Sequence, residues 1–368
     1  MKIAILTQPP RFNYGGILQT WALQQILRRM GHEPETVHWM LLPPRRKVKL
    51  VLKHYLGRLL HQRHHRPLPS EVEGWFAETR RFVDRNVALA CRDMKVPRSV
   101  WKPGRYDAYI VGSDQIWRPE YNPGKVLNAM FLEGAQRLQG IRRVAYAASF
   151  GADTWEFDPE QTEMARRLLP MFDAVSVRED SGVTLCRERL GVEAVHVLDP
   201  TLMLTADDYR SLISDSDRKA LHAKLSPDQR KRGYVWVYIL DRSEAKMSLV
   251  SDVCSRLGLQ PLFVGPEHNG AWVPPLEEWL AALDSASYVV TDSFHGAAFS
   301  IIYHKRFSAI NNRERGGARL TSLLRQFDLE DRERAEAPSL PIDWAAADAR
   351  LESLRTLSRD FLRRALGS

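Results

Sequence analysis

Short runs of β-branched and aromatic residues alternate with segments long enough for a helix along nearly the whole chain. This alternation predicts βα units stacked around parallel sheets. The strands expected in the first half cover residues 2–7, 106–112, 143–149, 174–178 and 194–198, and those in the second half cover residues 234–240, 261–264, 288–293 and 307–310. The sequence therefore predicts an α/β protein made of two doubly wound halves.

The length of the chain also favours two domains. At 368 residues it exceeds the size at which a single hydrophobic core usually stops growing. The expected boundary lies at Asp199-Pro200, because a proline disfavours helical geometry at the residue before it. We expect an N-terminal domain over residues 1–199, a C-terminal domain over 200–345 and a C-terminal helix over 346–368.

The net charge of +8 is concentrated in one segment. Eight arginines and lysines and no acidic residue occur between Arg45 and Arg66, namely Arg45, Arg46, Lys47, Lys49, Lys53, Arg58, Arg63 and Arg66. Apolar residues in this segment follow helical spacing, which predicts a basic amphipathic helix over residues 47–62. Its apolar face either packs on the first domain or lies against anionic lipid. Packing is favoured, because any core-facing helix shows one apolar stripe.

Three cysteines, Cys91, Cys186 and Cys254, match neither a zinc pattern nor a disulfide framework, and they favour reduced thiols in a cytoplasm. The short apolar stretch at the start is expected to be a buried strand, not a signal peptide. No run approaches the roughly 18 apolar residues of a membrane span, so any membrane contact is expected to be peripheral. We assign no metal site and expect no cofactor.

Two glycines follow the first expected strand, in the loop Asn13-Tyr14-Gly15-Gly16. Such a turn can present backbone N–H groups at a helix N-terminus, where an anion or a sugar hydroxyl binds. The spacing matches neither a dinucleotide fingerprint nor a P-loop. A tight turn without a ligand remains the alternative.

Polar residues also follow two later strands, in Gly112-Ser113-Asp114-Gln115-Ile116-Trp117 and in Ala148-Ser149-Phe150-Gly151. They are expected at the carboxyl edge of the sheet, where open α/β folds bind ligands. Asp114 either accepts a proton from an incoming hydroxyl or caps a helix. Ser149 would add a hydroxyl to the same crevice.

Cationic side chains follow strands in both halves. Arg178 can bind a carboxylate or phosphate through two hydrogen bonds, or else pair with Glu179 or Asp180. His295 shares a loop with Asp292 and Ser293 and can donate to an anion or act as an acid. Arg313, Arg315 and Arg319 form a cationic loop that either reaches a phosphate or stays solvated.

Taken in order, five segments give the chain its resemblance to a known family: Asn13-Tyr14-Gly15-Gly16-Ile17-Leu18-Gln19, Gly112-Ser113-Asp114-Gln115-Ile116-Trp117, Ser176-Val177-Arg178-Glu179, Leu198-Asp199-Pro200-Thr201-Leu202 and Thr291-Asp292-Ser293-Phe294-His295-Gly296. The chain resembles the polysaccharide pyruvyl transferase family from its first strand to about Ser322. The resemblance implies a GT-B-like fold, with two Rossmann-like doubly wound domains facing a cleft. It also implies transfer of pyruvyl from phosphoenolpyruvate onto sugar hydroxyls of a surface polysaccharide, which forms a cyclic ketal.

The resemblance places Arg178 and His295 at phosphoenolpyruvate. Several branches of the family have Arg-Leu-His where this chain has Ser293-Phe294-His295, so an arginine is absent there and one of the cationic loop is expected to replace it. The expected donor-binding residues are Arg178, Ser293, His295, Gly296, Arg313, Arg315 and Arg319. The expected acceptor-binding residues are Asn13, Tyr14, Gly15, Gly16, Gln19, Ser113, Asp114, Gln115, Trp117 and Ser149. The expected catalytic residues are His295, Arg178 and Asp114, with Asp114 as the base.

The expected partners are phosphoenolpyruvate and a glycan acceptor, free or linked to a diphosphate lipid, and the expected location is the cytoplasm, at the inner face of the membrane. The alternative is a GT-B glycosyltransferase that uses a nucleotide sugar, for which Glu267 offers a carboxylate to a ribose. A nucleic-acid-binding protein would explain the basic pI near 9.4. No nucleic-acid partner is expected, however, because the charge is confined to one segment and no known binding module is present.

Overall fold

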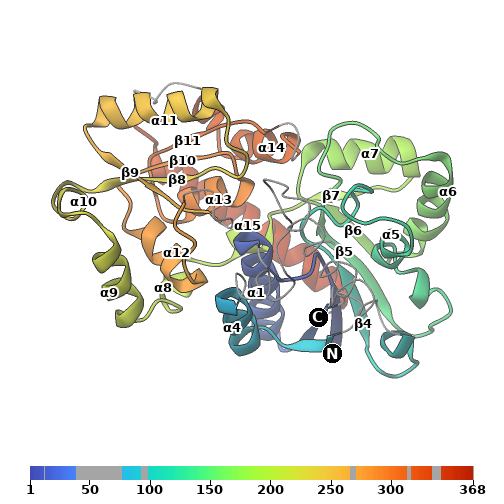
Figure 1. Cartoon of the computed structure of the whole chain (residues 1–368). Helices are drawn as coiled ribbons and strands as arrows, with labels where there is room; N and C mark the ends of the chain where they lie inside the picture. Colours follow the sequence, from blue (N-terminus) through green and yellow to red (C-terminus); the bar gives the residue numbers. More distant parts are fainter. Residues whose placement is uncertain are drawn as a thin grey trace, which may run out of the picture.

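The computed structural model describes residues 1–11, 13–38, 77–92, 98–265, 271–312, 316–333 and 341–367. Two sheets organise the chain, one of seven strands and one of four, and helices pack around each of them (Figure 1). Every strand pair within the two sheets is parallel. The expected α/β class with two doubly wound halves is therefore confirmed.

The first sheet has the strand order β3-β2-β1-β4-β5-β6-β7. Its strands are β1 (Lys2–Leu6), β2 (Glu33–His38), β3 (Leu89–Arg92), β4 (Ala108–Val111), β5 (Arg142–Ala148), β6 (Ala174–Val177) and β7 (Val195–His196). This is the order of a Rossmann-like fold, in which the chain reverses its direction of winding between β1 and β4.

Two strands of this sheet, β2 and β3, were not expected from the sequence. The β2 sequence Glu-Pro-Glu-Thr-Val-His begins with charged residues and a proline, which obscures its strand pattern. It forms because Lys2, Ile3, Ala4 and Ile5 of β1 pair with Glu33, Pro34, Glu35 and Thr36. Pairing with an apolar neighbour thus outweighed weak local propensity.

Helices connect these strands. They are α1 (Tyr14–Arg29), α4 (Ala77–Asn86), α5 (Lys125–Met130), α6 (Pro159–Leu168) and α7 (Asp180–Leu190), with the short 3₁₀ helices η1 (Arg98–Trp101), η2 (Glu133–Ala135) and η3 (Leu169–Met171). Helix α6 begins with proline after a capping box formed by Asp158 and Gln161. Helix α7 ends at Gly191, which adopts the left-handed conformation of a C-terminal cap.

The second sheet has the strand order β11-β10-β8-β9. Its strands are β8 (Tyr234–Tyr238), β9 (Gln260–Phe263), β10 (Tyr288–Thr291) and β11 (Phe307–Ala309), joined by α11 (Glu244–Leu257), α12 (Leu276–Asp284) and α13 (Phe294–Ile302). The chain reverses its winding between β8 and β10, so each half has one such point.

The remaining helices lie between and around the halves. They are η4 (Pro200–Met203), α8 (Ala206–Arg210), α9 (Asp215–Lys224), α10 (Pro227–Arg232), α14 (Ala318–Gln326), η6 (Glu330–Arg332) and α15 (Trp344–Leu366). Helix α15, drawn in red, returns to the first half and packs on β5 and η4 (Figure 1). Its Ser358 hydroxyl accepts a hydrogen bond of 3.0 Å from the Leu198 amide.

One apolar core joins the two halves. It contains Ile17 of α1, Trp236 of β8 and Phe361 of α15 among its buried members. Tyr14 packs between the halves, with ring centroids 5.4 Å from Trp279 and 6.4 Å from Tyr238. Its hydroxyl donates a 2.6 Å hydrogen bond to the carbonyl of Pro274. This shared core fixes the position of α1 against the second half.

Several expectations fall on residues that the structure does not describe: the basic helix over 47–62, Arg313, Arg315 and Glu267. Cys186 and Cys254 are buried, Cys91 is half-buried, and all three are free thiols. Among the helices of the described ranges, none combines the length and the apolar character needed to cross a membrane.

Candidate active site

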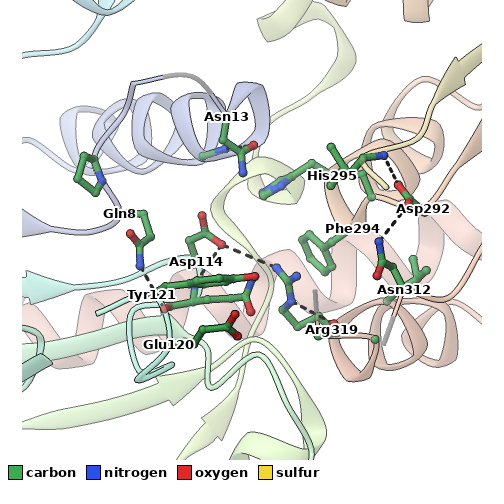
Figure 2. Close-up of a pocket in the computed structure, with 18 of the residues that line it drawn as sticks. Gln8, Asn13, Asp114, Glu120, Tyr121, Asp292, Phe294, His295, Asn312 and Arg319 are labelled. Atoms are coloured by element: carbon green, nitrogen blue, oxygen red, sulfur yellow. Dashed lines mark hydrogen bonds and ion pairs between the residues drawn. The ribbon is translucent and has the colours of Figure 1, made fainter. Parts of the chain in front are cut away.

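A cavity of about 440 Å³ lies between the two halves, where the reversal points of both sheets meet (Figure 2). The loops after β1 and β4 supply one wall, including Gln8, Asn13 and Asp114. The loops after β8 and β10 and the start of α14 supply the other, including His295 and Arg319. Because open α/β sheets bind ligands at these points, this cavity is the candidate active site.

Helix α1 begins at the cavity. Asn13 caps it, since its side-chain oxygen accepts a hydrogen bond of 3.2 Å from the Gly16 amide. Gly15 lies directly against His295: a Cβ atom at Gly15 would be 2.0 Å from Nδ1 of the imidazole. Only a glycine leaves room for the ring at this position.

Helix α13 begins at the same cavity from the second half. Ser293 caps it by accepting a hydrogen bond from the Gly296 amide. The N-termini of two helices from opposite halves therefore face one cavity, and both favour negative charge there.

A buried charge network lies beneath the floor of the cavity. Arg178, whose side chain is 0% exposed, donates through Nη2 to Oδ1 of Asp114 at 2.9 Å and through Nη1 to Oδ2 of Asp199 at 2.8 Å. Its guanidinium stacks 4.8 Å from the ring centre of Phe294. The fork of Arg178 thus joins two carboxylates from separate loops.

Asp199 accepts several further hydrogen bonds. Its Oδ2 also accepts from the Ser113 hydroxyl at 2.8 Å, and its Oδ1 accepts from the amide and hydroxyl of Thr201 at 3.0 and 2.7 Å. Burial by itself raises the pKa of Asp199, but His295, Arg178 and the Thr201 hydrogen bonds lower it to about 2. Asp199 is therefore a fixed negative charge.

Asp114 lines the cavity above Arg178. Burial raises its pKa, but the charges of Arg178, His295 and Arg319 outweigh burial and hold the pKa below its usual value. Its Oδ1 accepts from Arg178 and from the Gln115 amide. Asp114 starts no helix here, so the helix-capping interpretation is wrong.

His295 is the titratable group best placed for proton transfer. Its Nε2 lies 3.9 Å from Oδ2 of Asp199, beyond hydrogen-bond distance, and has no hydrogen-bond partner among the described residues. Burial lowers its pKa to about 4, partly opposed by Asp199 and assisted by Arg178. The imidazole is therefore neutral at pH 7.

Arg319 of α14 is a cation on the cavity wall, which Arg11 also lines. Its Nη1 lies 3.8 Å from Oδ1 of Asp114, and its guanidinium is 6.0 Å from the ring centre of Phe294 (Figure 2). Burial and the neighbouring charge of Arg178 lower its pKa to about 10, so it stays protonated at pH 7.

A second network fixes the loops of the C-terminal half. Asp292 accepts hydrogen bonds from the Leu240 amide at 2.7 Å, from Lys246 at 2.7 Å and from Asn312 at 3.0 Å. These bonds join the ends of β8 and β10 to the segment after β11. Asp292 is therefore a positioning residue at the cavity wall (Figure 2).

Seven of the residues expected at the site line the cavity: Asn13, Gly16, Asp114, Gln115, Ser293, His295 and Arg319. Eight others do not line it: Tyr14, Gly15, Gln19, Ser113, Trp117, Ser149, Arg178 and Gly296. Tyr14, Gly15, Ser113 and Arg178 contact the site from behind or from the interface between the halves, as described above.

The other four have structural contacts. Gln19 is buried and donates to Thr7 and to the Gly16 carbonyl. Trp117 is 0% exposed, stacks on Phe131 and donates to a backbone carbonyl. Ser149 is buried and accepts from the Gly151 amide. Gly296 packs closely on Thr291.

The alternative expected from the sequence, in which Arg178 pairs with Glu179 or Asp180, is not observed. Neither Glu179 nor Asp180 forms a hydrogen bond or ion pair with Arg178, although the charge of Glu179 raises the pKa of Arg178. Glu179 accepts from the amides of Phe150 and Gly151, and Asp180 pairs with Arg325. Arg178 and Glu179 lie in the bend after β6 and Asp180 begins α7, and the partners of Arg178 come from other loops.

Sequence reasoning missed several residues on the cavity wall, among them the polar residues Gln8, Arg11, Glu120, Tyr121 and Asn312. Gln8 directly follows β1 and could have been found by its place at a strand end. The others lie several residues beyond a strand, in loops whose path only the tertiary structure decides.

Comparison with known proteins gives one family match. The family described as polysaccharide pyruvyl transferase matches residues 13–314. A comparison with curated protein sequences finds no match.

Solved structures align over most of the chain at low identity. UDP-GlcNAc 2-epimerase from Methanocaldococcus jannaschii is 12% identical, with a TM-score of 0.48 and coverage of 96% of this chain and 92% of that one. Arabidopsis thaliana UGT89C1 complexed with UDP-L-rhamnose is 10% identical, with a TM-score of 0.49 and coverage of 99% and 98%. A glycosyltransferase from Rickettsia africae is 11% identical, with a TM-score of 0.45 and coverage of 99% and 96%.

Proposed function

Because the chain belongs to the polysaccharide pyruvyl transferase family, we propose that it moves the pyruvyl group of phosphoenolpyruvate onto two hydroxyls of a polysaccharide sugar. The products would be a cyclic pyruvate ketal and phosphate. The acceptor would be a surface polysaccharide or its precursor, free or linked to a diphosphate lipid.

The observation that supports this donor is the convergence of positive groups on one cavity. Arg319 lies on the wall, His295 is beside it, and the N-termini of α1 and α13 face the same space. Phosphoenolpyruvate has a carboxylate and a phosphate within a few bonds, which matches clustered cationic groups and helix N-termini. Arg319 would replace the arginine absent at Ser293.

The reaction needs a proton at the methylene carbon of phosphoenolpyruvate. Its arrival makes C2 electron-poor, and a sugar hydroxyl then adds to C2 and loses its proton. The bond from C2 to the phosphate oxygen breaks, phosphate leaves with that electron pair, and a second hydroxyl adds to C2 and closes the ketal. Overall, the two acceptor hydroxyls lose two protons. One proton is balanced by the proton added to the methylene carbon, and the other goes to phosphate or solvent.

His295 is our proposed acid. Its imidazole is neutral at pH 7, but an anion bound beside Nε2 would raise its pKa and so favour the protonated form. The protonated ring would supply the proton or stabilise the leaving phosphate. Asp199, 3.9 Å from Nε2, would balance the added charge.

Asp114 is our proposed contact for the acceptor hydroxyl. Its lowered pKa makes it a weak base, so it would orient the hydroxyl and accept its proton only as the bond to C2 forms. Arg178 holds Asp114 and Asp199 in place from behind the cavity. We therefore propose that Arg178 affects catalysis mainly by positioning these two carboxylates, and not by binding the donor directly.

A ligand-induced shift in thermal unfolding tests the donor. A ligand at about one hundred times its Kd stabilises the folded state by roughly 2.7 kcal/mol. We expect a clear increase in Tm with phosphoenolpyruvate and none with uridine or guanosine diphosphate sugars. The reverse pattern would identify a nucleotide-sugar glycosyltransferase and overturn the proposal. Mass spectrometry of reactions with a panel of glycosides then identifies the pyruvylated product.

A further inference from the structure

We infer that Tyr121 and Glu120 form a subsite for a neutral sugar ring of the acceptor, on the wall of the cavity that belongs to the N-terminal half. The inference deepens the proposed function and rests on it for the identity of the acceptor. Neither residue belongs to the motifs that support the family resemblance.

Tyr121 is an aromatic side chain that is open to solvent and lines the cavity. It is 36% exposed, whereas the other described tyrosines of the chain, such as Tyr109 and Tyr238, are at most 4% exposed. A partly exposed aromatic ring in a concave site is a surface for the apolar face of a ligand.

The ring of Tyr121 is held from the side opposite the cavity. The Arg118 guanidinium lies 5.1 Å from the ring centroid, and its Nη1 is 3.5 Å from the tyrosine hydroxyl. Arg118 lines a neighbouring pocket and not this cavity, whereas Tyr121 lines this cavity. One face of the ring is thus covered and the other is available.

Arg118 is itself fixed. Its side chain is 8% exposed and donates to Glu156 through Nε at 3.0 Å and through Nη2 at 3.2 Å. Asn122 closes the same turn by donating to the carbonyls of Gln115 and Arg118 at 2.9 and 3.2 Å. A platform held this firmly loses little conformational entropy when a ligand binds.

Polar groups flank the ring. The Glu120 carboxylate is 61% exposed, lies 3.0 Å from Arg118 and lines the cavity next to Tyr121 (Figure 2). Gln8 lines the same wall, and its amide nitrogen donates to Asn122 at 3.0 Å. A pyranose ring has a face of C–H groups and a rim of hydroxyls, which suits an aromatic ring flanked by a carboxylate and an amide.

The Glu120 carboxylate disfavours the anionic donor as the ligand next to Tyr121. Phosphoenolpyruvate would place its anionic groups beside the Glu120 carboxylate, which is unfavourable. Arg11 also lines the cavity from the N-terminal half, but Arg319 and His295, the groups proposed to bind the donor, come from the C-terminal half. A sugar on Tyr121 would leave those groups to the donor, with Asp114 between the two ligands.

Saturation-transfer difference NMR tests the subsite without turnover. The probes are methyl glycosides of β-galactose, β-glucose and α-mannose, each at millimolar concentration, with saturation of the aromatic protons of the protein. We expect transfer to ring protons of at least one glycoside. Tyr121→Ala should weaken binding about tenfold, and Tyr121→Phe should retain most of it because the ring remains.

Leu357→Ala is the matched control, because Leu357 is 41% exposed on α15 and does not line the cavity. It should bind the glycosides like the wild type. No transfer to any glycoside in the wild type, or equal transfer in Tyr121→Ala, would overturn the inference.

Kinetics separates this inference from the proposed function. Once an acceptor is turned over, Tyr121→Ala should raise its KM about tenfold and leave the KM for phosphoenolpyruvate unchanged. Absence of any pyruvylated product from the wild type contradicts the proposed function, even if glycosides bind at Tyr121. Turnover with an unchanged acceptor KM in Tyr121→Ala contradicts the subsite alone.

Discussion

Gly15 and His295, from opposite halves of the molecule, are in contact at the candidate active site. A Cβ atom at Gly15 would lie 2.0 Å from Nδ1 and 2.2 Å from Cγ of the imidazole. The first turn of α1 therefore fixes the position of a side chain that begins α13. The proposed acid of the reaction depends on a glycine that does not line the cavity.

Gly15→Ala should lower turnover by a factor on the order of one hundred, because displacement of a catalytic group by about 1 Å has effects of this size. Steady-state kinetics measures this loss. Gly16→Ala is the comparison: its Cβ would lie 3.5 Å from its nearest neighbours, an ordinary contact, so a much smaller loss is expected. Equal effects of the two variants would contradict the role given to the Gly15 contact.

Arg178 should matter for both stability and activity. Arg178→Ala leaves buried Asp199 without an arginine partner and Asp114 with only Arg319 at 3.8 Å, and it should lower the free energy of unfolding by about 3–5 kcal/mol. Arg178→Lys keeps the charge but loses the fork that joins Asp114 and Asp199, so it should fold and still lose activity. Arg142→Lys, in an exposed pair with Asp173, should change stability by less than about 1 kcal/mol. Denaturant unfolding and initial rates check these values.

His295 predicts a pH dependence of stability. Its pKa falls from 6.5 to about 4 on folding, so folding disfavours its protonated form. The stability is complete above pH 6.5 and decreases by about 3 kcal/mol as the pH falls to 4. Asp199, with a pKa lowered to about 2, loses its contribution only below pH 3.8, in a separate window.

The measurement for this prediction is the difference between two unfolding curves. Burial also lowers the pKa of His32 and His196, and these histidines contribute to the slope of both proteins. The part of the pH dependence of the unfolding free energy that His295→Gln removes between pH 6.5 and pH 4 is the contribution of His295. Parallel stability curves for the wild type and the variant would show that His295 is not desolvated.

Arg319 should be required for binding the donor anion. Arg319→Ala should abolish the increase in Tm that phosphoenolpyruvate produces, and Arg319→Lys should restore part of it because a single charge remains. Arg363→Ala on α15 removes an exposed arginine that does not line the cavity and should keep the full shift. An undiminished shift in Arg319→Ala would remove this residue from the donor site.

The alternative interpretation of the basic segment, contact with anionic lipid, has a direct test. Each lysine or arginine near an anionic surface contributes about 1 kcal/mol, so replacing Arg46, Lys49, Lys53 and Arg58 by glutamine should weaken vesicle binding roughly a thousandfold. Activity on a soluble acceptor should be unchanged. Four exposed residues elsewhere, replaced in the same way, give a control of equal net charge: Arg187, Arg189, Lys219 and Arg232. Equal vesicle binding by the two variants would exclude a specific role of the segment.

Local patterns were sufficient for much of the fold. The strands β1, β4 to β6 and β8 to β11 are apolar runs followed by polar loops, and their positions agree with the sequence-based expectation within a few residues. Both β2 and β3 were missed because their stability comes from neighbours: β2 pairs with β1, and β3 pairs with β2. A strand that depends on its neighbours leaves a weak local signal.

The candidate site shows the same division. Asp114, Ser293 and His295 were identified because each follows a strand and therefore reaches the carboxyl edge of its sheet. Trp117 and Ser149 follow strands too, yet their side chains turn into the core and into backbone contacts. The direction of a side chain depends on the path of its loop, which spacing alone does not decide.

The sequence by itself determined that the chain forms two α/β halves with parallel sheets. It also determined which loops carry polar and cationic residues. Both follow from local properties, namely the apolar runs that become buried strands and the turns that separate them. Only the tertiary structure decided that Arg178 joins Asp114 and Asp199, that Gly15 fixes His295, and that Tyr121 lies on Arg118 beside the cavity. These contacts join residues far apart in the chain, and their geometry follows from how two sheets pack around a shared core. Long-range packing of this kind leaves no periodic signal in the sequence.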